Sequence, residues 1–90
     1  MLKIVSSNRF KKDLKIAIRR GYKIELLEEV VNELASGKNL DAKYKDHELS
    51  GEFKGLRECH ITPDWLLIYQ VIENELVLYL SRTGTHSDLF

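Results

Sequence analysis

Residues 65–72 read Trp-Leu-Leu-Ile-Tyr-Gln-Val-Ile, an almost continuous apolar run. A run of this length predicts a central strand that is covered on both faces of a sheet. Strand-like segments also occur before it, at residues 53–61, and after it, at residues 76–80. The segments are separated by two turn candidates, Thr62-Pro63-Asp64 and Glu73-Asn74-Glu75. The C-terminal half therefore predicts consecutive antiparallel strands.

The N-terminal half combines one short strand with two helices. Residues 2–5 are apolar and partly β-branched, which predicts a strand. The first helix is expected between the N-cap candidates Ser6 and Ser7 and the stop at Gly21, with an apolar stripe of Phe10, Leu14, Ala17 and Ile18. The second ends at Gly37, and its stripe is Ile24, Leu27, Val30, Val31 and Leu34. The short link between them predicts an antiparallel helix hairpin.

These elements predict a single α+β domain over residues 1–90, in the order β-α-α-β-β-β. The helix hairpin is expected to pack on a mostly antiparallel four-stranded sheet. Residues 38–52 lack periodicity and are expected to form a loop that is long for so small a protein. Long loops in compact domains are often functional.

Composition favours a globular protein of the cytoplasm. Of its 90 residues, 43% are hydrophobic and 31% are charged. The single Cys59 excludes an internal disulfide framework and a cysteine-based zinc finger. The N-terminus does not resemble a signal peptide, and no stretch approaches the roughly 18 apolar residues of a membrane span. We therefore expect a reducing, cytoplasmic location and no membrane contact.

Charge is unevenly distributed although the formal net charge is zero. Residues 1–23 hold eight basic side chains and a single acid, Asp13, whereas residues 24–52 carry a net charge of −5 and residues 53–90 a net charge of −2. A basic segment of this size can attract phosphate. A solvated helix face in a charge-rich protein is the alternative interpretation.

Strand register predicts where the polar side chains meet. If the second hairpin is centred near Asn74, Leu66 faces Arg82; if the first is centred near Pro63, His60 faces Trp65 or Leu66. Because adjacent strands lie ~4.8 Å apart, one end of three strands should then collect His60, Asp64, Trp65 and Arg82. His86 follows within four residues of Arg82, and the register does not place His47.

This residue set suits cleavage of RNA by its own 2′-hydroxyl. A histidine with a pKa near its free value of ~6.5 can accept or donate a proton, and an arginine can stabilise the charge on a phosphorane. The reaction needs no metal and no cofactor. Base stacking is expected from an aromatic side chain, with Trp65, Tyr44, Tyr69 and Phe90 as candidates.

Each of these residues also has an ordinary structural interpretation. His60 can be a hydrogen-bonded strand histidine, Asp64 a turn former and Trp65 a core residue, and Arg82 can be ion-paired. A zinc site built from histidines and Asp64 is chemically possible, but no short ligand spacing such as H-x-x-x-H supports it. We therefore expect no metal site.

Four sequence blocks carry a resemblance to a known family: Tyr44–Leu49 with Gly51, Phe53–Ile61, Pro63–Tyr69 and Arg82–Phe90. They are similar to the YafQ branch of the RelE/ParE-like bacterial toxins, and the N-terminal half agrees in pattern only. The resemblance implies a RelE-like fold and a ribosome-dependent mRNA endonuclease, the toxin of a type II toxin–antitoxin pair. It also implies cleavage by 2′-hydroxyl attack that leaves a 2′,3′-cyclic phosphate.

Carried over by position, the resemblance implies that the active residues are His47, His60, Asp64, Trp65, Arg82, His86 and Phe90. His86 is expected to be the general acid or base, assisted by His60 and His47. Arg82 is expected to stabilise the phosphorane and Asp64 to orient a histidine. Substrate binding is expected from Trp65 and Phe90, which shape the base pocket, and from Lys54 and Arg57.

The resemblance further implies its partners. These are the 70S ribosome with its mRNA and a cognate antitoxin. The antitoxin is expected to be of the ribbon-helix-helix type, and the toxin–antitoxin complex is expected to bind operator DNA through it. Two other functions stay open. One is a non-catalytic ParE-like toxin that binds a protein, although such relatives lack this set of histidine, aspartate and arginine. The other is an RNA-binding module that uses the basic helix without catalysis.

Overall fold

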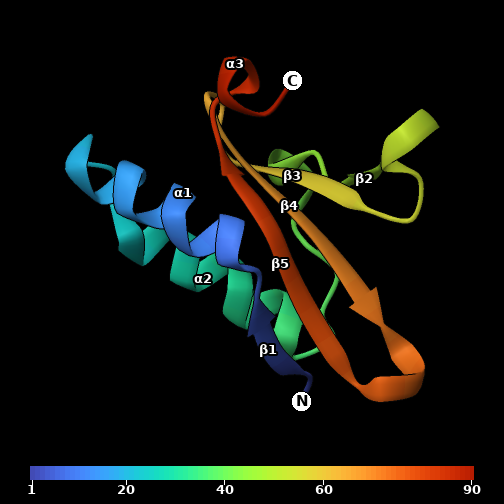
Figure 1. Ribbon diagram of the computed structural model, residues 1–90. Coiled ribbons are helices and arrows are strands. Elements are labelled where there is room, and N and C mark those ends of the chain that lie inside the picture. The colour runs from blue at the N-terminus through green and yellow to red at the C-terminus, as the bar shows by residue number, and fades with distance from the viewer.

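The computed structural model describes residues 1–90 and confirms the predicted α+β class (Figure 1). The strands form one sheet in the order β1-β5-β4-β3-β2, in which β1 is parallel to β5 and the other pairs are antiparallel. Their bounds are β1 Lys3–Ser6, β2 His47–Glu48, β3 Arg57–Thr62, β4 Trp65–Ile72 and β5 Val77–Gly84. The helices are α1 Asn8–Arg19, α2 Ile24–Ala35 and α3 His86–Leu89, and the short 3-10 helices are η1 Ala42–Tyr44, η2 Gly51–Phe53 and η3 Glu73–Glu75.

The predicted count of four strands was wrong by one. The extra strand, β2, lies inside the segment expected to be a loop and pairs with the start of β3. Two residues are too few for a periodic signal, so this strand exists through its pairing rather than through its own pattern. The C-terminal helix α3 is likewise too short to be seen by periodicity.

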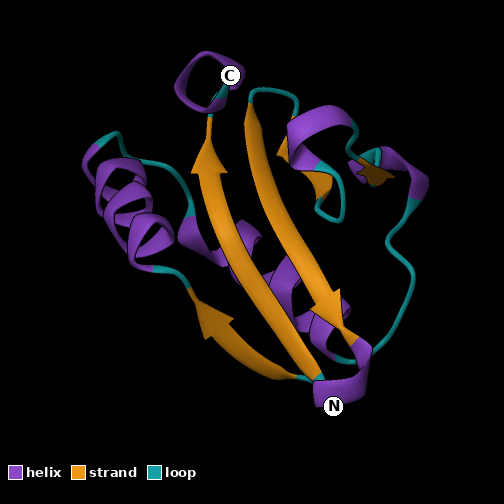
Figure 2. Ribbon diagram, turned by 45° about the vertical axis from the view of Figure 1, so that its right-hand side comes forward, coloured by secondary structure: helices purple, strands orange, loops and turns teal.

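The sheet has a helix face and an open face (Figure 2). On the helix face, alternate residues of β4 join β3, β5, α1 and α2 in a core of 14 buried residues. The open face of β4 is covered more thinly, by Leu89 of α3 and by two leucines that flank β2 and β3. The prediction that β4 is covered on both faces is thus confirmed.

Helix α1 begins where the sequence predicts but buries a different stripe. The Ser7 hydroxyl accepts a hydrogen bond from the Phe10 N–H at 2.9 Å, and Gly21 follows the helix with φ +79°. Asp13 is only 7% exposed, whereas Ile18 is 56% exposed, so the prediction that Ile18 lies in the core was wrong. The face of α1 that packs on the sheet includes the Asp13 carboxylate. A search for apolar residues at helical spacing does not detect such a residue.

Asp13 closes an otherwise unpaired strand edge. Strand β1 pairs with β5 only as far as Leu80, so the last residues of β5 pair with β4 on one side and have no strand on the other side. The Asp13 carboxylate accepts hydrogen bonds from the Thr83 N–H at 3.2 Å and from Nε and Nη2 of Arg82 at 2.7 and 3.2 Å. The Ser7 hydroxyl donates to the Ser81 carbonyl at 2.7 Å. Helix α1 thus replaces the missing strand with side chains.

The β4–β5 register differs from the prediction by two residues. Arg82 faces Ile68 and Leu66 faces Gly84, because the connection is the 3-10 turn η3 and a bulge leaves Ser81 unpaired. The positive φ falls on Leu76, not on Asn74. The β3–β4 register, in which His60 faces Leu66, is as predicted.

The thiol of Cys59 lies in the core and is fully buried. Burial raises its pKa to about 12, so the thiol stays protonated at neutral pH. Cys59 therefore acts as a small apolar core residue. None of the helices has the length and apolar character that a membrane crossing requires.

Replacement of Asp13 by alanine is expected to lower the free energy of unfolding by about 2 kcal/mol, because it leaves the Arg82 guanidinium and the Thr83 N–H without their acceptor. The partial exposure of Arg82 keeps the loss below that of a fully buried pair. Urea unfolding followed by circular dichroism measures it. The control is Glu28→Ala, an exposed acid of α2 in no ion pair, expected within about 0.5 kcal/mol of the wild type. Equal losses in both variants would contradict the role of Asp13.

Candidate active site

A row of residues crosses the open face of the sheet. The strand pairings place His47 opposite Glu58, Glu58 opposite Ile68, and Ile68 opposite Arg82. Directly paired residues point to the same face, and neighbouring strands lie ~4.8 Å apart. Four strands therefore bring His47, Glu58 and the backbone of Arg82 into one line. The next row contains His60, Leu66 and Gly84.

Glu58 is the centre of a histidine pair. Its residue is 5% exposed, yet its Oε1 lies 3.4 Å from Nε2 of His60 and 3.7 Å from Nε2 of His47. The other ring nitrogens face backbone carbonyls, Nδ1 of His47 at 2.7 Å from Lys45 and Nδ1 of His60 at 3.4 Å from Pro63. Each ring is thus held between a backbone carbonyl and one shared carboxylate. This arrangement sets the orientation of both imidazoles before any substrate arrives.

Glu58 was not among the residues predicted from the sequence. A signal for it exists in the strand alternation, because Glu58 and His60 are two residues apart on β3 and so share a face. In the sequence alone, a glutamate beside Arg57 resembles an exposed strand residue. Its burial depends on β2, which covers it from the side.

Arg82 lies in the same row but turns toward α1. Its guanidinium is bound by Asp13 through Nε and Nη2, and its side chain is 24% exposed. Two hydrogen bonds to one carboxylate give the guanidinium a defined orientation. The remaining N–H groups stay available for an anion.

Helix α3 carries His86 and is held in place by three sets of interactions. The Thr85 hydroxyl accepts from the Asp88 N–H and the Asp88 carboxylate accepts from the Thr85 N–H, which forms a capping box. Asp88 also receives two hydrogen bonds from Arg20 at 2.6 and 3.2 Å, and Leu89 packs onto Leu66 and Ile68. A Cβ on residue 84 would lie 3.0 Å from Asp88 side-chain atoms, so this close approach favours glycine. His86 therefore projects from a fixed helix.

The exposed aromatic side chain of Phe90 adjoins His86, and the half-buried Phe53 lies behind it. The rings of His86 and Phe90 have centroids 4.9 Å apart, and Phe90 meets Phe53 edge-on at 5.2 Å. Phe90 is 48% exposed, and the exposed Lys54 follows Phe53 in the chain. An open aromatic surface next to an imidazole and a lysine can accept a base and its phosphate.

Three predicted site residues lie elsewhere. Trp65 is 3% exposed on the helix face, where its indole N–H donates to the Thr83 hydroxyl at 2.8 Å, so it cannot stack on a base. Arg57 binds Asp46 and does not face the open side. Asp64 is exposed in the β3–β4 turn and lines a hollow with Tyr22 and Lys23 of the helix layer. The expected convergence with His60 and Arg82 therefore does not include Asp64 and Trp65, and Arg57, which was expected to bind substrate, also lies apart from it.

Arg57 and Asp46 anchor the long connection instead. Asp46 accepts hydrogen bonds from Nε and Nη2 of Arg57, both at 3.3 Å, and from the Tyr69 hydroxyl at 2.5 Å. The hydrogen bond to Asp46 raises the pKa of Arg57, and burial, followed by the same carboxylate, raises that of Tyr69 well above its usual range. The anchor fixes the segment that leads into β2 and thereby His47. No group of three histidine, cysteine, aspartate or glutamate side chains has a geometry that could hold a metal ion.

Comparison with known proteins identifies the family. Residues 2–90 match the family model described as the bacterial toxin of the type II toxin–antitoxin system, YafQ. The chain belongs to the YafQ family. It is 40% identical over 85 residues to the mRNA interferase toxin YafQ of Escherichia coli strain K12, an alignment that covers 93% of this chain and 90% of that toxin.

Solved structures of bacterial toxins share the whole fold. A metal-bound toxin from Helicobacter pylori has a TM-score of 0.94 and 50% identity, with complete coverage of both chains. YafQ in the E. coli DinJ-YafQ complex has a TM-score of 0.90 and 38% identity over 100% of this chain and 99% of that one. The sheet and helices that position the site are therefore those of the YafQ family.

The Arg20–Asp88 pair is expected to contribute its full stabilisation of α3 at all pH values above about 4. The hydrogen bond from Arg20, and next that from the Thr85 N–H, keep the pKa of Asp88 well below its usual range. A carboxyl with a lowered folded-state pKa contributes its full stabilisation above the unfolded value of ~3.9, and that contribution declines progressively as the pH falls from this value through the folded-state pKa. At pH 7, Arg20→Gln should speed amide exchange of Leu89 and Phe90 several-fold.

The control for this measurement is Arg19→Gln, the neighbouring exposed arginine, which forms no ion pair. Amide exchange followed by NMR should show no change in that variant. Unchanged exchange in Arg20→Gln would show that the capping box and Leu89 hold α3 without the ion pair.

Proposed function

We propose that this chain is a ribosome-dependent mRNA endoribonuclease and the toxin of a type II toxin–antitoxin pair. The observation that carries the proposal is the buried Glu58 between His47 and His60, in one row with Arg82 on the open face of the sheet. Family membership and the name of the E. coli relative, an mRNA interferase toxin, support the same activity.

The proposed reaction is attack of a ribose 2′-oxygen on the adjacent phosphorus. A base removes the 2′-hydroxyl proton, the new P–O bond forms, the P–O5′ bond breaks, and an acid protonates the departing 5′-oxygen. The products are a 2′,3′-cyclic phosphate and a free 5′-hydroxyl. Imidazoles can supply both proton transfers and guanidinium the charge stabilisation, so the mechanism needs no metal ion.

His86 is the proposed general acid or base. It is exposed, it projects from a fastened helix, and it lies against Phe90, where a base can stack. His60 and His47 assist proton transfer or hold phosphate, and Glu58 orients both rings. We assign to Glu58 the orienting role that the resemblance implies for Asp64.

The remaining polar groups bind the RNA backbone. Arg82, oriented by Asp13, stabilises the phosphorane, and Lys54 binds a phosphate beside Phe90 and Phe53. Trp65 contributes indirectly, since its hydrogen bond to Thr83 supports the end of β5 that bears Arg82.

The proposed partners are the ribosome, mRNA and a cognate antitoxin. YafQ of E. coli has been solved in the DinJ-YafQ toxin-antitoxin complex, and this chain shares its fold. We infer an antitoxin of the ribbon-helix-helix type, with operator DNA bound only through the complex. The basic α1 offers a surface for an acidic antitoxin segment.

Expression in bacteria from a tightly controlled promoter tests the activity. The wild type should arrest growth and produce in-frame cuts in translated mRNAs, seen by mapping of mRNA 5′ ends. His86→Ala should lower cleavage by about a hundredfold or more, because general acid–base catalysis contributes at least that much. Ser87→Ala, an exposed neighbour on α3, is the matched control and should behave as the wild type.

Growth arrest without in-frame cuts would reject the nuclease. Equal cleavage by His86→Ala would reject the role of that histidine. Cleavage should persist after chelation of metals when ribosomes are kept intact by other means. Loss that a transition metal restores would contradict the metal-independent mechanism.

Replacement of Glu58 by glutamine is expected to slow cleavage by about ten- to a hundredfold, since both imidazoles lose the charge that orients them. The shape of the side chain is kept, so the melting temperature should change little. Single-turnover cleavage by purified protein with programmed ribosomes measures the effect. Glu48→Gln, the exposed neighbour on β2, is the control. Full activity of Glu58→Gln would exclude the orienting role.

A further inference from the structure

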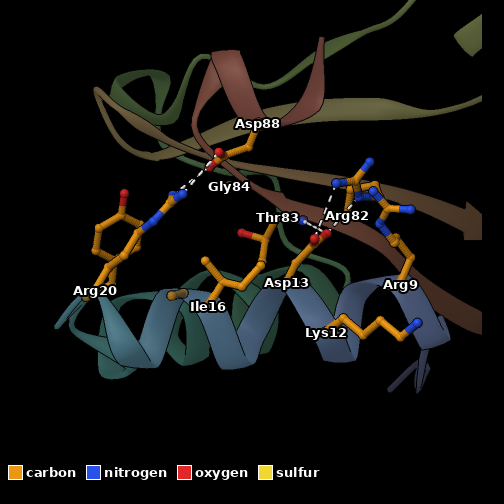
Figure 3. A pocket seen from close by; sticks show the side chains of 11 residues that line it. Arg9, Lys12, Asp13, Ile16, Arg20, Arg82, Thr83, Gly84 and Asp88 are labelled. Carbon is orange, nitrogen blue, oxygen red and sulfur yellow. Dashed lines mark hydrogen bonds and ion pairs between the residues drawn. The ribbon is translucent and has the colours of Figure 1, made fainter.

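A cavity of about 400 Å³ lies between α1 and the end of β5 (Figure 3). Helix α1 lines it with Arg9, Lys12 and Asp13, and with Arg20 at its far end. Arg82 and Thr83 of β5 and Asp88 of α3 complete the polar wall. This cavity is separate from the Glu58–histidine cluster but shares Arg82 with that row.

The charges in this cavity are unbalanced. Both carboxylates are already bound, Asp13 by Arg82 and the Thr83 N–H, and Asp88 by Arg20 and the Thr85 N–H. Arg9 and Lys12 form no ion pair with any acid of the chain. Two exposed cations therefore remain at the cavity beside an arginine of fixed orientation.

Such an arrangement favours an anion with several oxygens. Figure 3 shows Arg9 on the same side of the cavity as Arg82. Like charges that line one cavity are stabilised by an anion between them, and a forked guanidinium fits a phosphate. Because Asp13 already holds Arg82, binding costs little further ordering of that side chain.

We propose that this cavity binds an RNA backbone phosphate next to the one that is cleaved. The proposal rests on the nuclease function above. Arg82 connects the two places, since its backbone lies in the row with Glu58 and its guanidinium lies at the cavity. The RNA chain then crosses the end of β5 and continues over α1. Arg9 and Lys12 are its phosphate-binding residues there.

Binding of an RNA of about ten nucleotides, 2′-O-methylated throughout, tests the proposal, because this RNA cannot be cleaved and the result does not depend on catalysis. Fluorescence anisotropy between about 50 and 300 mM KCl gives the affinity and its salt dependence. The variant Arg9→Gln/Lys12→Gln should bind about tenfold more weakly at low salt. Its log–log salt slope should be smaller by about 0.7 to 1.4, the value for one or two single-strand phosphate contacts.

The matched control is Lys15→Gln/Arg19→Gln. It removes the same charge from exposed positions of the same helix, outside the cavity. Its slope should change much less than that of the cavity variant. Equal changes in both variants would overturn the proposal in favour of net charge, and so would an unchanged cavity variant or a wild type that does not bind the RNA.

A deca-glutamate peptide distinguishes an acidic protein segment from RNA. If the cavity variant loses peptide binding and keeps RNA binding, the cavity is a protein-docking site and the proposal fails. Absence of mRNA cuts in cells would instead reject the nuclease and leave the measured phosphate contact unchanged. The two failures are therefore distinguishable.

Discussion

The ion pair between Asp13 and Arg82 is the interaction on which the rest of the structure depends. Strand β1 ends beside Leu80. If α1 were absent, the last residues of β5 would therefore expose backbone N–H groups on that side. One buried carboxylate satisfies the Thr83 N–H and holds the Arg82 guanidinium at the same time. The contact that joins the helix layer and the sheet thus also orients the guanidinium that we propose binds phosphate.

The two faces of the sheet carry different kinds of residue. The helix face buries Trp65, Tyr69 and Cys59 and supplies stability, while the open face carries His47, Glu58 and His60. Tyr69 and Arg57 reach the single carboxylate of Asp46 and so fix the segment before β2. The core therefore positions His47 although that residue lies on the other side of the sheet.

The C-terminal helix α3 is held in place by contacts within its own turn and by contacts with distant parts of the chain. A capping box, an ion pair to α1 and one buried leucine hold four residues that could not form a stable helix alone. Figure 1 shows α3 at the end of the sheet where β5 ends, above the open face. His86 and Phe90 owe their position to these contacts, and the proposed nuclease uses both.

The sequence by itself determined the class of the fold and most of its elements. The apolar run of β4, the turn at Pro63, the cap at Ser7 and the stops at Gly21 and Gly37 are local signals with local physical causes. Only tertiary structure decided that Asp13 and Glu58 are buried, that Trp65 faces the core, and that Arg57 belongs to an anchor. Burial depends on which segment covers a residue, and a bulge at Ser81 or a two-residue strand such as β2 leaves no periodic trace in the chain.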